Sequence, residues 1–330
     1  MITQKPSKPT PLPGITATLK AGFEVTTKHW WIAILPALLD MFYWLGPRLS
    51  PYHLVEQAMS FLTNQAMLAE MNQQLLTTAQ QTNLFANLTI PFIGVPTLMR
   101  LIPPQTPIVT QTIEIQNFGV WFGLLMAISI VGFLLTAFYF TLIAQAVKRP
   151  SNGRPPLKTF IRHVLSTWVY LIMVGMGVLL ASLIIFFPLM ILSTLLSLIT
   201  PQLVILVLIS GMMFIFWLAV FLGFTPHGLT LNNRPLTKAV WESVQLVRLN
   251  YISTITLLLA IAGITMVMDQ LMHYADDGSW FTLSSIIGHA FVSTALVAAS
   301  YVFYQDRIAI QWVAQRQTMP IDQIEETSNG

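Results

Sequence analysis

The chain has 330 residues, of which 55% are hydrophobic and only 9% are charged. A soluble domain carries roughly 25% charged residues, and one core of ordinary surface-to-volume ratio cannot bury such an excess of apolar side chains. The composition therefore excludes an ordinary soluble protein and predicts an all-α polytopic membrane protein. With a net charge of only +3 we expect no nucleic-acid partner, and without cysteine no disulfide or thiolate metal site can form.

The first 14 residues, MITQKPSKPTPLPG, are polar and rich in proline, and they contain no apolar core of their own. Such a segment is typical of a disordered tail and does not resemble a cleaved signal peptide. We expect residues 1–14 and 317–330 to be cytoplasmic tails. Between them, residues 15–316 are predicted to form a single membrane domain with an external insertion at residues 46–118.

Six segments are apolar over the ~20 residues that a helix needs to cross a bilayer. Pro188 lies inside the third of them and predicts a kink or a break, because proline cannot donate a backbone hydrogen bond. The predicted spans are Trp30–Leu45, Val120–Val147, Trp168–Ile199, Leu203–Phe224, Tyr251–Met272 and Ser285–Tyr304.

The positions of the basic residues predict the orientation of the spans. With the N-terminus in the cytoplasm, 14 of the 16 lysines and arginines lie on the cytoplasmic side, and only Arg48 and Arg100 lie outside. Basic residues next to spans are retained on the cytoplasmic side. We therefore expect a plasma (inner) membrane protein with both termini in the cytoplasm and the lipid bilayer as its main partner.

A short amphipathic helix is predicted ahead of the first, third and fifth spans. KAGFE at residues 20–24 and KAVWE at residues 238–242 match, and PLKTFIRHVLSTWVY repeats the outline. We interpret this as three parallel repeats, each an interfacial helix followed by a helical hairpin. Alternatively, any helix entering from the cytoplasm selects such residues. The predicted interfacial anchors are Lys20, Glu24, Trp30, Lys158, Arg162, Trp168, Lys238, Trp241, Glu242 and Arg248.

Two faces are predicted for each of these helices. Ahead of the first span, Ile15, Leu19, Phe23 and Trp30 form an apolar stripe opposite the charged residues. Ahead of the fifth span, Lys238, Glu242 and Gln245 form the polar stripe, which we expect to face the lipid headgroups.

The external insertion is predicted to hold one or two helices within residues 52–81 and a short extended piece within residues 109–118. The stretch between them, LFANLTIPFIGVPTLMRLIPPQ, is apolar and interrupted by four prolines. We expect this stretch to cap the bundle. The alternative is a docking surface for another membrane or envelope protein.

The segment FTPHGLTLNNRPLTKAVWESVQLVRLNYISTITLLLAI carries a recognisable pattern. A proline, Pro226, ends a span, and an Ala-x-x-x-Ser helix with Ala239 and Ser243 leads through Arg248 and Asn250 into the next. This pattern resembles bacterial six-helix membrane families of unknown function, related to the membrane domain fused to some glycerophosphodiester phosphodiesterases. The resemblance implies a six-helix fold and no agreed activity. It carries over no catalytic residues, because the soluble phosphodiesterase barrel is absent.

Ionisable residues near spans are the remaining candidates for chemistry. Asp40, Asp269, His273 and His289 are predicted to share the outer side, where carboxylates and imidazoles bind a divalent cation or relay protons. Alternatively, they are ordinary hydrated or paired groups at membrane ends. The 16 methionines could bind Cu(I), although packing explains them as well.

The sequence contains no H-E-x-x-H, G-x-S-x-G, P-loop or G-x-G-x-x-G motif, so we expect neither an enzyme nor a bound cofactor. The function predicted first is a non-enzymatic scaffold, accessory subunit or modulator of the envelope. The alternative is a transporter or lipid-handling permease with a cavity between the repeats. A metal-dependent enzyme using Asp40, Asp269 and His273 is the third hypothesis.

Overall fold

The computed structural model describes residues 13–60, 69–90, 94–100, 106–148, 156–197, 200–273 and 279–318. The predicted tails therefore lie almost entirely outside the described residues. In chain order the elements are α1 (Ile15–Lys28), η1 (Trp30–Ala33), α2 (Ile34–Leu45), β1 (Arg48–Ser50), α3 (Tyr52–Ser60), α4 (Ala69–Gln81), η3 (Leu84–Leu88), β2 (Thr112–Glu114), α5 (Phe118–Val147), α6 (Leu157–Ser197), α7 (Pro201–Leu222), α8 (Thr225–Asn232), α9 (Leu236–Leu249), α10 (Tyr251–His273) and α11 (Thr282–Thr318).

The all-α prediction is confirmed, and five helical segments are long and apolar enough to cross a membrane. They are Phe118–Val147, Leu157–Ser197, Leu203–Asn232, Tyr251–Leu271 and Thr282–Ala309. The first predicted span, Trp30–Leu45, is shorter and is divided into the 3₁₀ turn η1 and helix α2. A sixth span therefore stays a prediction.

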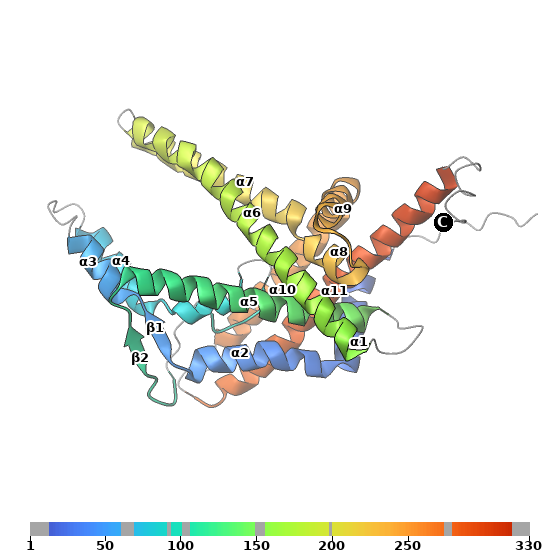
Figure 1. The fold of residues 1–330 in the computed structure, drawn as a ribbon, viewed down its shortest axis with the longest axis horizontal. Helices are drawn as coiled ribbons and strands as arrows, with labels where there is room; N and C mark the ends of the chain where they lie inside the picture. Colours follow the sequence, from blue (N-terminus) through green and yellow to red (C-terminus); the bar gives the residue numbers. More distant parts are fainter. Residues whose placement is uncertain are drawn as a thin grey trace, which may run out of the picture.

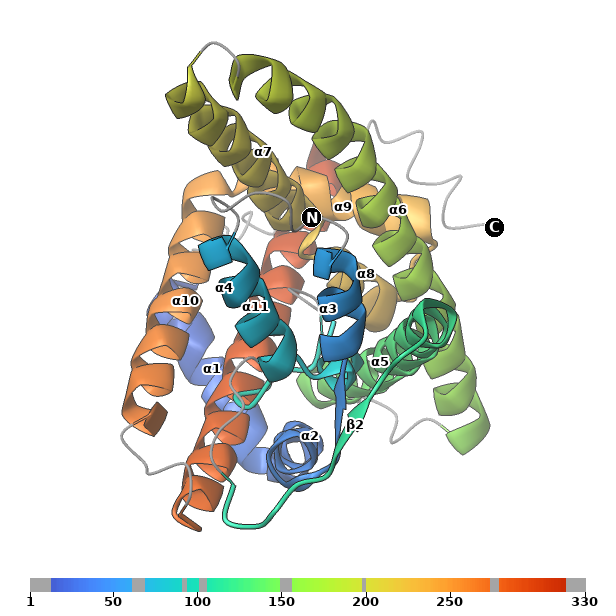
Figure 2. The ribbon, with the colours of Figure 1, turned by 90° about the vertical axis from the view of Figure 1, so that its left-hand side faces the viewer.

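Helix α11 contacts α1, α2, α5, α8, α9 and α10, and in Figure 2 it lies between α10 on one side and α5 on the other. Its most apolar stretch is 67% buried, whereas that of each other long segment is 11% buried. Three small residues of α11 at four-residue spacing, Ala290, Thr294 and Ala298, are all about 1% exposed. Small residues at this spacing let neighbouring helices approach closely, which agrees with their burial.

The most buried face of α1 consists of small residues and lies beside the predicted apolar stripe. Thr18, Gly22 and Thr26 are the buried residues of α1, while Trp30 at its end is 63% exposed. A Cβ atom on Gly22 would lie 2.5 Å from the Ala295 carbonyl oxygen, so the two helix backbones are nearly in contact. Small side chains permit this approach and bulky ones would prevent it. Leu19 and Ile15 lie at the edge of this contact and are only partly buried.

The three predicted repeats are not established by the fold. Helices α1 and α9 each have 14 residues and end at similar backbone angles, φ −127° at His29 and φ −124° at Asn250. Both capping side chains bond to the carbonyl oxygen four residues earlier. However, Lys20 precedes His29 by nine residues and Lys238 precedes Asn250 by twelve, so the matching pentapeptides are out of register.

The middle unit lacks a separate interfacial helix. Lys158 and Arg162 lie in the first turns of α6, which continues without a break for 41 residues and passes through Pro188. No capped turn like those at His29 and Asn250 interrupts it. Of the two outcomes predicted at Pro188, the break is therefore wrong, and the kink stays a prediction.

Helices α6 and α7 form a long hairpin that extends away from the other helices (Figure 1). Large apolar side chains cover its outer part, and Ile184, Phe187 and Met212 are 72%, 70% and 68% exposed. In a bilayer such a surface faces lipid tails, so its exposure is consistent with a membrane-spanning hairpin.

The segment predicted to be the external insertion folds onto one end of the bundle. The predicted helices appear as α3 and α4, and the predicted extended piece as β2, which pairs in parallel with β1 through Leu49 and Ile113. Val95 and Met99, 0% and 8% exposed, join the main apolar core. These two residues cap the bundle, as the favoured interpretation predicts.

Candidate functional site

Three of the four predicted outer residues lie together in the structure. Asp40 comes from α2, Asp269 from α10 and His289 from α11. The His289 Nδ1 atom lies 3.8 Å from Asp40 Oδ2, and His289 Nε2 lies 3.8 Å from Asp269 Oδ1. We call these three residues the outer trio. The side chain of the fourth, His273, lies outside the described residues.

Burial changes steeply across the outer trio. The Asp40 side chain is fully buried and that of His289 is 5% exposed, whereas that of Asp269 is 44% exposed. Asp40 Oδ1 accepts a hydrogen bond of 2.8 Å from the Met99 backbone N–H. Asp40 Oδ2 and His289 Nδ1, which face each other, are buried and form no hydrogen bond. A buried carboxylate is thus connected to the surface through one imidazole.

This geometry suits a proton better than a metal ion. The two carboxylates face opposite nitrogens of the ring, so no single cation can contact both carboxylates and the same imidazole nitrogen. Within the described ranges no group of three His, Asp or Glu side chains is arranged to hold a metal. An imidazole between two carboxylates can instead accept a proton on one nitrogen and donate one from the other.

A second buried polar group lies at the other end of α11 and was not predicted. Glu242 of α9 is 8% exposed, and its Oε1 lies 3.1 Å from Arg234 Nε. Its Oε2 accepts a hydrogen bond of 2.8 Å from the Tyr304 hydroxyl of α11. We call Arg234, Glu242 and Tyr304 the inner cluster.

The inner cluster corrects the prediction that Glu242 faces the headgroups. The partners of Glu242 come from the turn after α8 and from α11. The periodicity of α9 alone does not reveal them. One signal was present, because Glu242 is the only acidic residue between Glu114 and Asp269. A lone acid beside apolar segments is costly to bury without a partner, and the same cost makes Arg234 a natural counter-ion.

Three residues of the Pro226–Asn250 pattern, which resembles six-helix membrane families, have local structural roles. Ser243 Oγ accepts from the Phe224 N–H at 3.1 Å and donates to the Phe221 carbonyl at 2.6 Å, which fixes the corner between α7 and α8. Ala239 is fully buried against Gly228, where a larger side chain would not fit. Asn250 caps α9.

Short helix α8 is held by hydrogen bonds to α6 and α11. His227 Nε2 lies 2.8 Å from Ser300 Oγ, and Thr230 Oγ1 lies 2.9 Å from the Tyr301 hydroxyl. From α6, His163 Nε2 lies 3.0 Å from the Thr230 carbonyl oxygen. These contacts fill the space beside α11 with bonded polar and aromatic groups.

Eight of the ten predicted anchors have exposed side chains, and two do not. Trp168 is half-buried, and its indole N–H donates 3.0 Å to the Ile130 carbonyl of α5, so it joins two helices. Glu242 belongs to the inner cluster. The exposed anchors, whose interfacial role stays a prediction, are Lys20, Glu24, Trp30, Lys158, Arg162, Lys238, Trp241 and Arg248.

The fold and its apolar helices define an all-α, multi-pass membrane protein. Comparison with protein-family models, with curated proteins and with solved structures finds no match. The resemblance of the Pro226–Asn250 segment to six-helix membrane families therefore stays a prediction.

Proposed function

We propose that this chain is a non-enzymatic component of the bacterial plasma membrane, a scaffold or accessory subunit with both termini in the cytoplasm. The observation that carries the proposal is the filled centre of the bundle. Tyr139, Tyr301, Phe303 and Tyr304 are each 0% exposed where α11 meets its neighbours. A transport pathway along the axis would have to displace this central helix.

The α6–α7 hairpin supports the same proposal. Its outer part contacts the rest of the chain little, and it presents apolar side chains laterally (Figure 1). An accessory subunit needs a lateral surface that its own chain leaves uncovered, and this part of the hairpin provides one.

Photo-crosslinking in intact cells tests the scaffold role. A photoreactive amino acid placed at Ile184 or Met212 is expected to yield discrete protein adducts, and the same probe at exposed Lys158 is the matched control. Adducts to lipid alone at both hairpin positions would contradict the scaffold role.

The proposed orientation has a direct test, because the natural chain contains no cysteine. Val109→Cys in the external insertion should react with an impermeant maleimide in intact cells. Lys238→Cys at the start of α9 should react only after the membrane is opened. The reverse labelling pattern would invert the topology.

A second candidate function, a proton-linked transporter or permease, is favoured by the outer trio. Carboxylate and histidine chains inside membrane proteins commonly relay protons. In proteoliposomes loaded with a pH-sensitive dye, this function predicts proton flux that His289→Gln abolishes. The scaffold role predicts equal, background flux for the wild type and the variant.

A further inference from the structure

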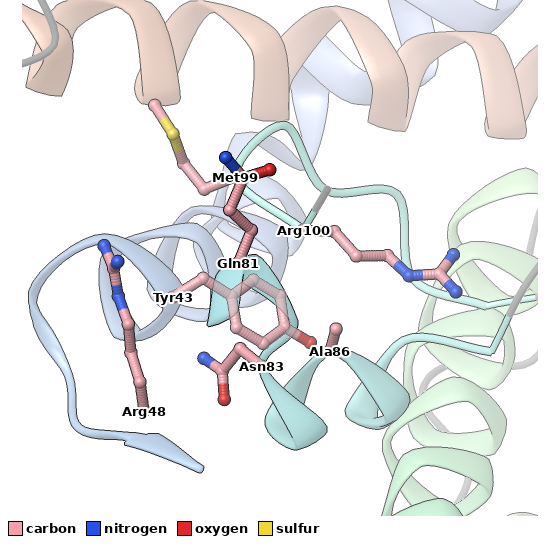
Figure 3. A pocket seen from close by; sticks show the side chains of 7 residues that line it. All are labelled: Tyr43, Arg48, Gln81, Asn83, Ala86, Met99 and Arg100. Atoms are coloured by element: carbon pink, nitrogen blue, oxygen red, sulfur yellow. The ribbon is translucent and has the colours of Figure 1, made fainter. Parts of the chain in front are cut away.

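The hollow lined by Arg48 and Arg100, where α2 meets the predicted external insertion, is too small for a ligand (Figure 3). Its interior has room for about one water molecule. The start of α1 instead combines an open surface with a buried cation.

The N-terminus of α1 is open and uncapped. Gly14 at the N-cap position has no side chain that accepts a hydrogen bond, and the first turn contains no acidic residue. A Cβ atom on Gly14 would meet no atom within 4 Å, and Gly14, Thr16 and Ala17 are exposed. The Thr18 N–H donates to the Gly14 carbonyl, but the N–H groups of residues 15–17 have no partner among the described residues.

Arg307 of α11 lies directly beside this N-terminus. Its side chain belongs to a residue that is 3% exposed, and its Nη2 donates a hydrogen bond of 3.3 Å to the Pro13 carbonyl oxygen. The Nε and Nη1 atoms are buried and have no hydrogen-bond partner. The guanidinium carbon lies 4.1 Å from the centre of the Phe303 ring, so the ring covers one face of the cation.

The positive charge at this place is only partly compensated. Among the described side chains no carboxylate forms an ion pair with Arg307, and the neighbouring Asp306 acts on it as a nearby charge. Asp306 is partly exposed whereas Arg307 is buried, so water screens the negative charge more than the positive one. The helix N-terminus adds about half an elementary positive charge. An anion at the open surface is therefore attracted by both.

The same place lies at the level of lipid headgroups. Pro13 contacts Arg307 and Gly22 approaches Ala295, so α1 and α11 run in opposite directions. Arg307 lies near the end of the apolar segment Thr282–Ala309. With the proposed topology this end is cytoplasmic, where the headgroups of the inner leaflet lie.

We propose that the start of α1 binds a phosphate group, whose oxygens accept hydrogen bonds from the N–H groups of the first turn while Arg307 supplies positive charge from the buried side. Helix N-termini bind phosphates in this way, because their N–H groups point at the ligand and the dipole favours a negative charge. The phosphate comes either from an inner-leaflet phospholipid or from a free phosphate ester. This site goes beyond the scaffold role and does not depend on it.

Binding can be measured with the purified full-length protein in a maltoside detergent, by calorimetry and by the thermal unfolding midpoint. Three probes separate the sources of the phosphate: dioctanoyl phosphatidylglycerol, inorganic phosphate, and dioctanoylglycerol, which lacks phosphate. Binding by phosphatidylglycerol alone identifies a lipid headgroup site, and binding by inorganic phosphate identifies a free anion site.

Gly14→Asp is the first variant, because an aspartate at the N-cap accepts the first-turn N–H groups itself and repels phosphate. The extended backbone of Gly14, with φ −67° and ψ 163°, suits a capping aspartate. We expect phosphate binding to weaken about tenfold or more, because charge-assisted hydrogen bonds are lost. The unfolding midpoint without ligand should equal or exceed that of the wild type. Gly14→Ala fits the same open space without a charge, so it is the matched control and should bind like the wild type.

Arg307→Gln tests the buried cation separately. It removes the charge, keeps an amide that can donate to the Pro13 carbonyl, and should weaken phosphate binding at least severalfold. Lys238→Gln, which removes an exposed cation on α9, is its control and should bind like the wild type. If Arg307→Gln does not elute as a folded protein, Gly14→Asp decides the question.

Three results would overturn the proposal. The first is that no phosphate-containing probe binds or raises the unfolding midpoint. The second is that dioctanoylglycerol acts as strongly as phosphatidylglycerol, which would place the effect in the lipid tails. The third is that Gly14→Asp binds phosphate as tightly as Gly14→Ala.

Discussion

Replacing Gly22 by alanine is expected to separate α1 from α11. The added Cβ would lie 2.5 Å from the Ala295 carbonyl oxygen and 2.6 Å from both the backbone N and the Cβ of Ala299. Carbon atoms in ordinary contact are 3.5–4.0 Å apart, so the helices must move by about 1 Å. Since the atoms in the way are mostly backbone, no rotamer change relieves the clash.

Two opposing terms set the magnitude. Overpacking costs about 1–3 kcal/mol, and alanine is favoured over glycine within a helix by about 1 kcal/mol. We therefore expect Gly22→Ala to lower the free energy of unfolding by up to about 2 kcal/mol. In Gly263→Ala, where no atom lies within 4 Å of the added Cβ, only the favourable helix term remains.

Thermal unfolding of the purified variants in detergent, followed by tryptophan fluorescence, measures the difference. The Gly22→Ala midpoint should fall below that of the wild type, and the Gly263→Ala midpoint should equal or exceed it. Equal midpoints for the two variants would show that α1 and α11 are not in the close contact on which the estimate depends.

Two further substitutions test the buried polar groups by the same assay. Glu242→Ala should lower the free energy of unfolding by about 2–4 kcal/mol, because it leaves Arg234 and the Tyr304 hydroxyl without their carboxylate. The control, Lys238→Ala at an exposed position, should change the free energy of unfolding by less than about 0.5 kcal/mol. Asp40→Ala should lower the free energy of unfolding by about 1–3 kcal/mol, because the buried Met99 N–H loses its acceptor. Asp269→Ala should lower it far less, because the Asp269 side chain is 44% exposed. Equal losses within either pair would contradict the assigned burial.

Features that depend on a single segment were predicted well from the sequence. Length and hydropathy marked the apolar helices α5, α6, α7, α10 and α11 close to their observed ranges. Helical periodicity also found α3 and α4, and alternation found β2. These signals are local, because a helix or strand is formed by residues that are neighbours in the chain.

Predictions that needed the partner of a segment were less successful. The match between KAGFE and KAVWE suggested equivalent positions, yet the two helices align by their capped ends and place Lys20 and Lys238 three residues out of register. The apolar stripe of α1 was predicted, but the buried face of Thr18, Gly22 and Thr26 that packs on α11 was not. In lipid, close packing favours small side chains over large apolar ones, so hydrophobicity alone does not identify this face.

The sequence by itself determined the class of this protein, because an apolar excess of this size can be buried only in a membrane. The positions of the basic residues predicted the orientation of the spans. It also predicted that Asp40, Asp269 and His289 share one side of the bundle. Only the tertiary structure decided that His289 lies between the two carboxylates and that Glu242 is buried against Arg234 and Tyr304. These contacts join residues 8 to 249 positions apart in elements that meet only after folding, and no local pattern in the chain records which faces will touch.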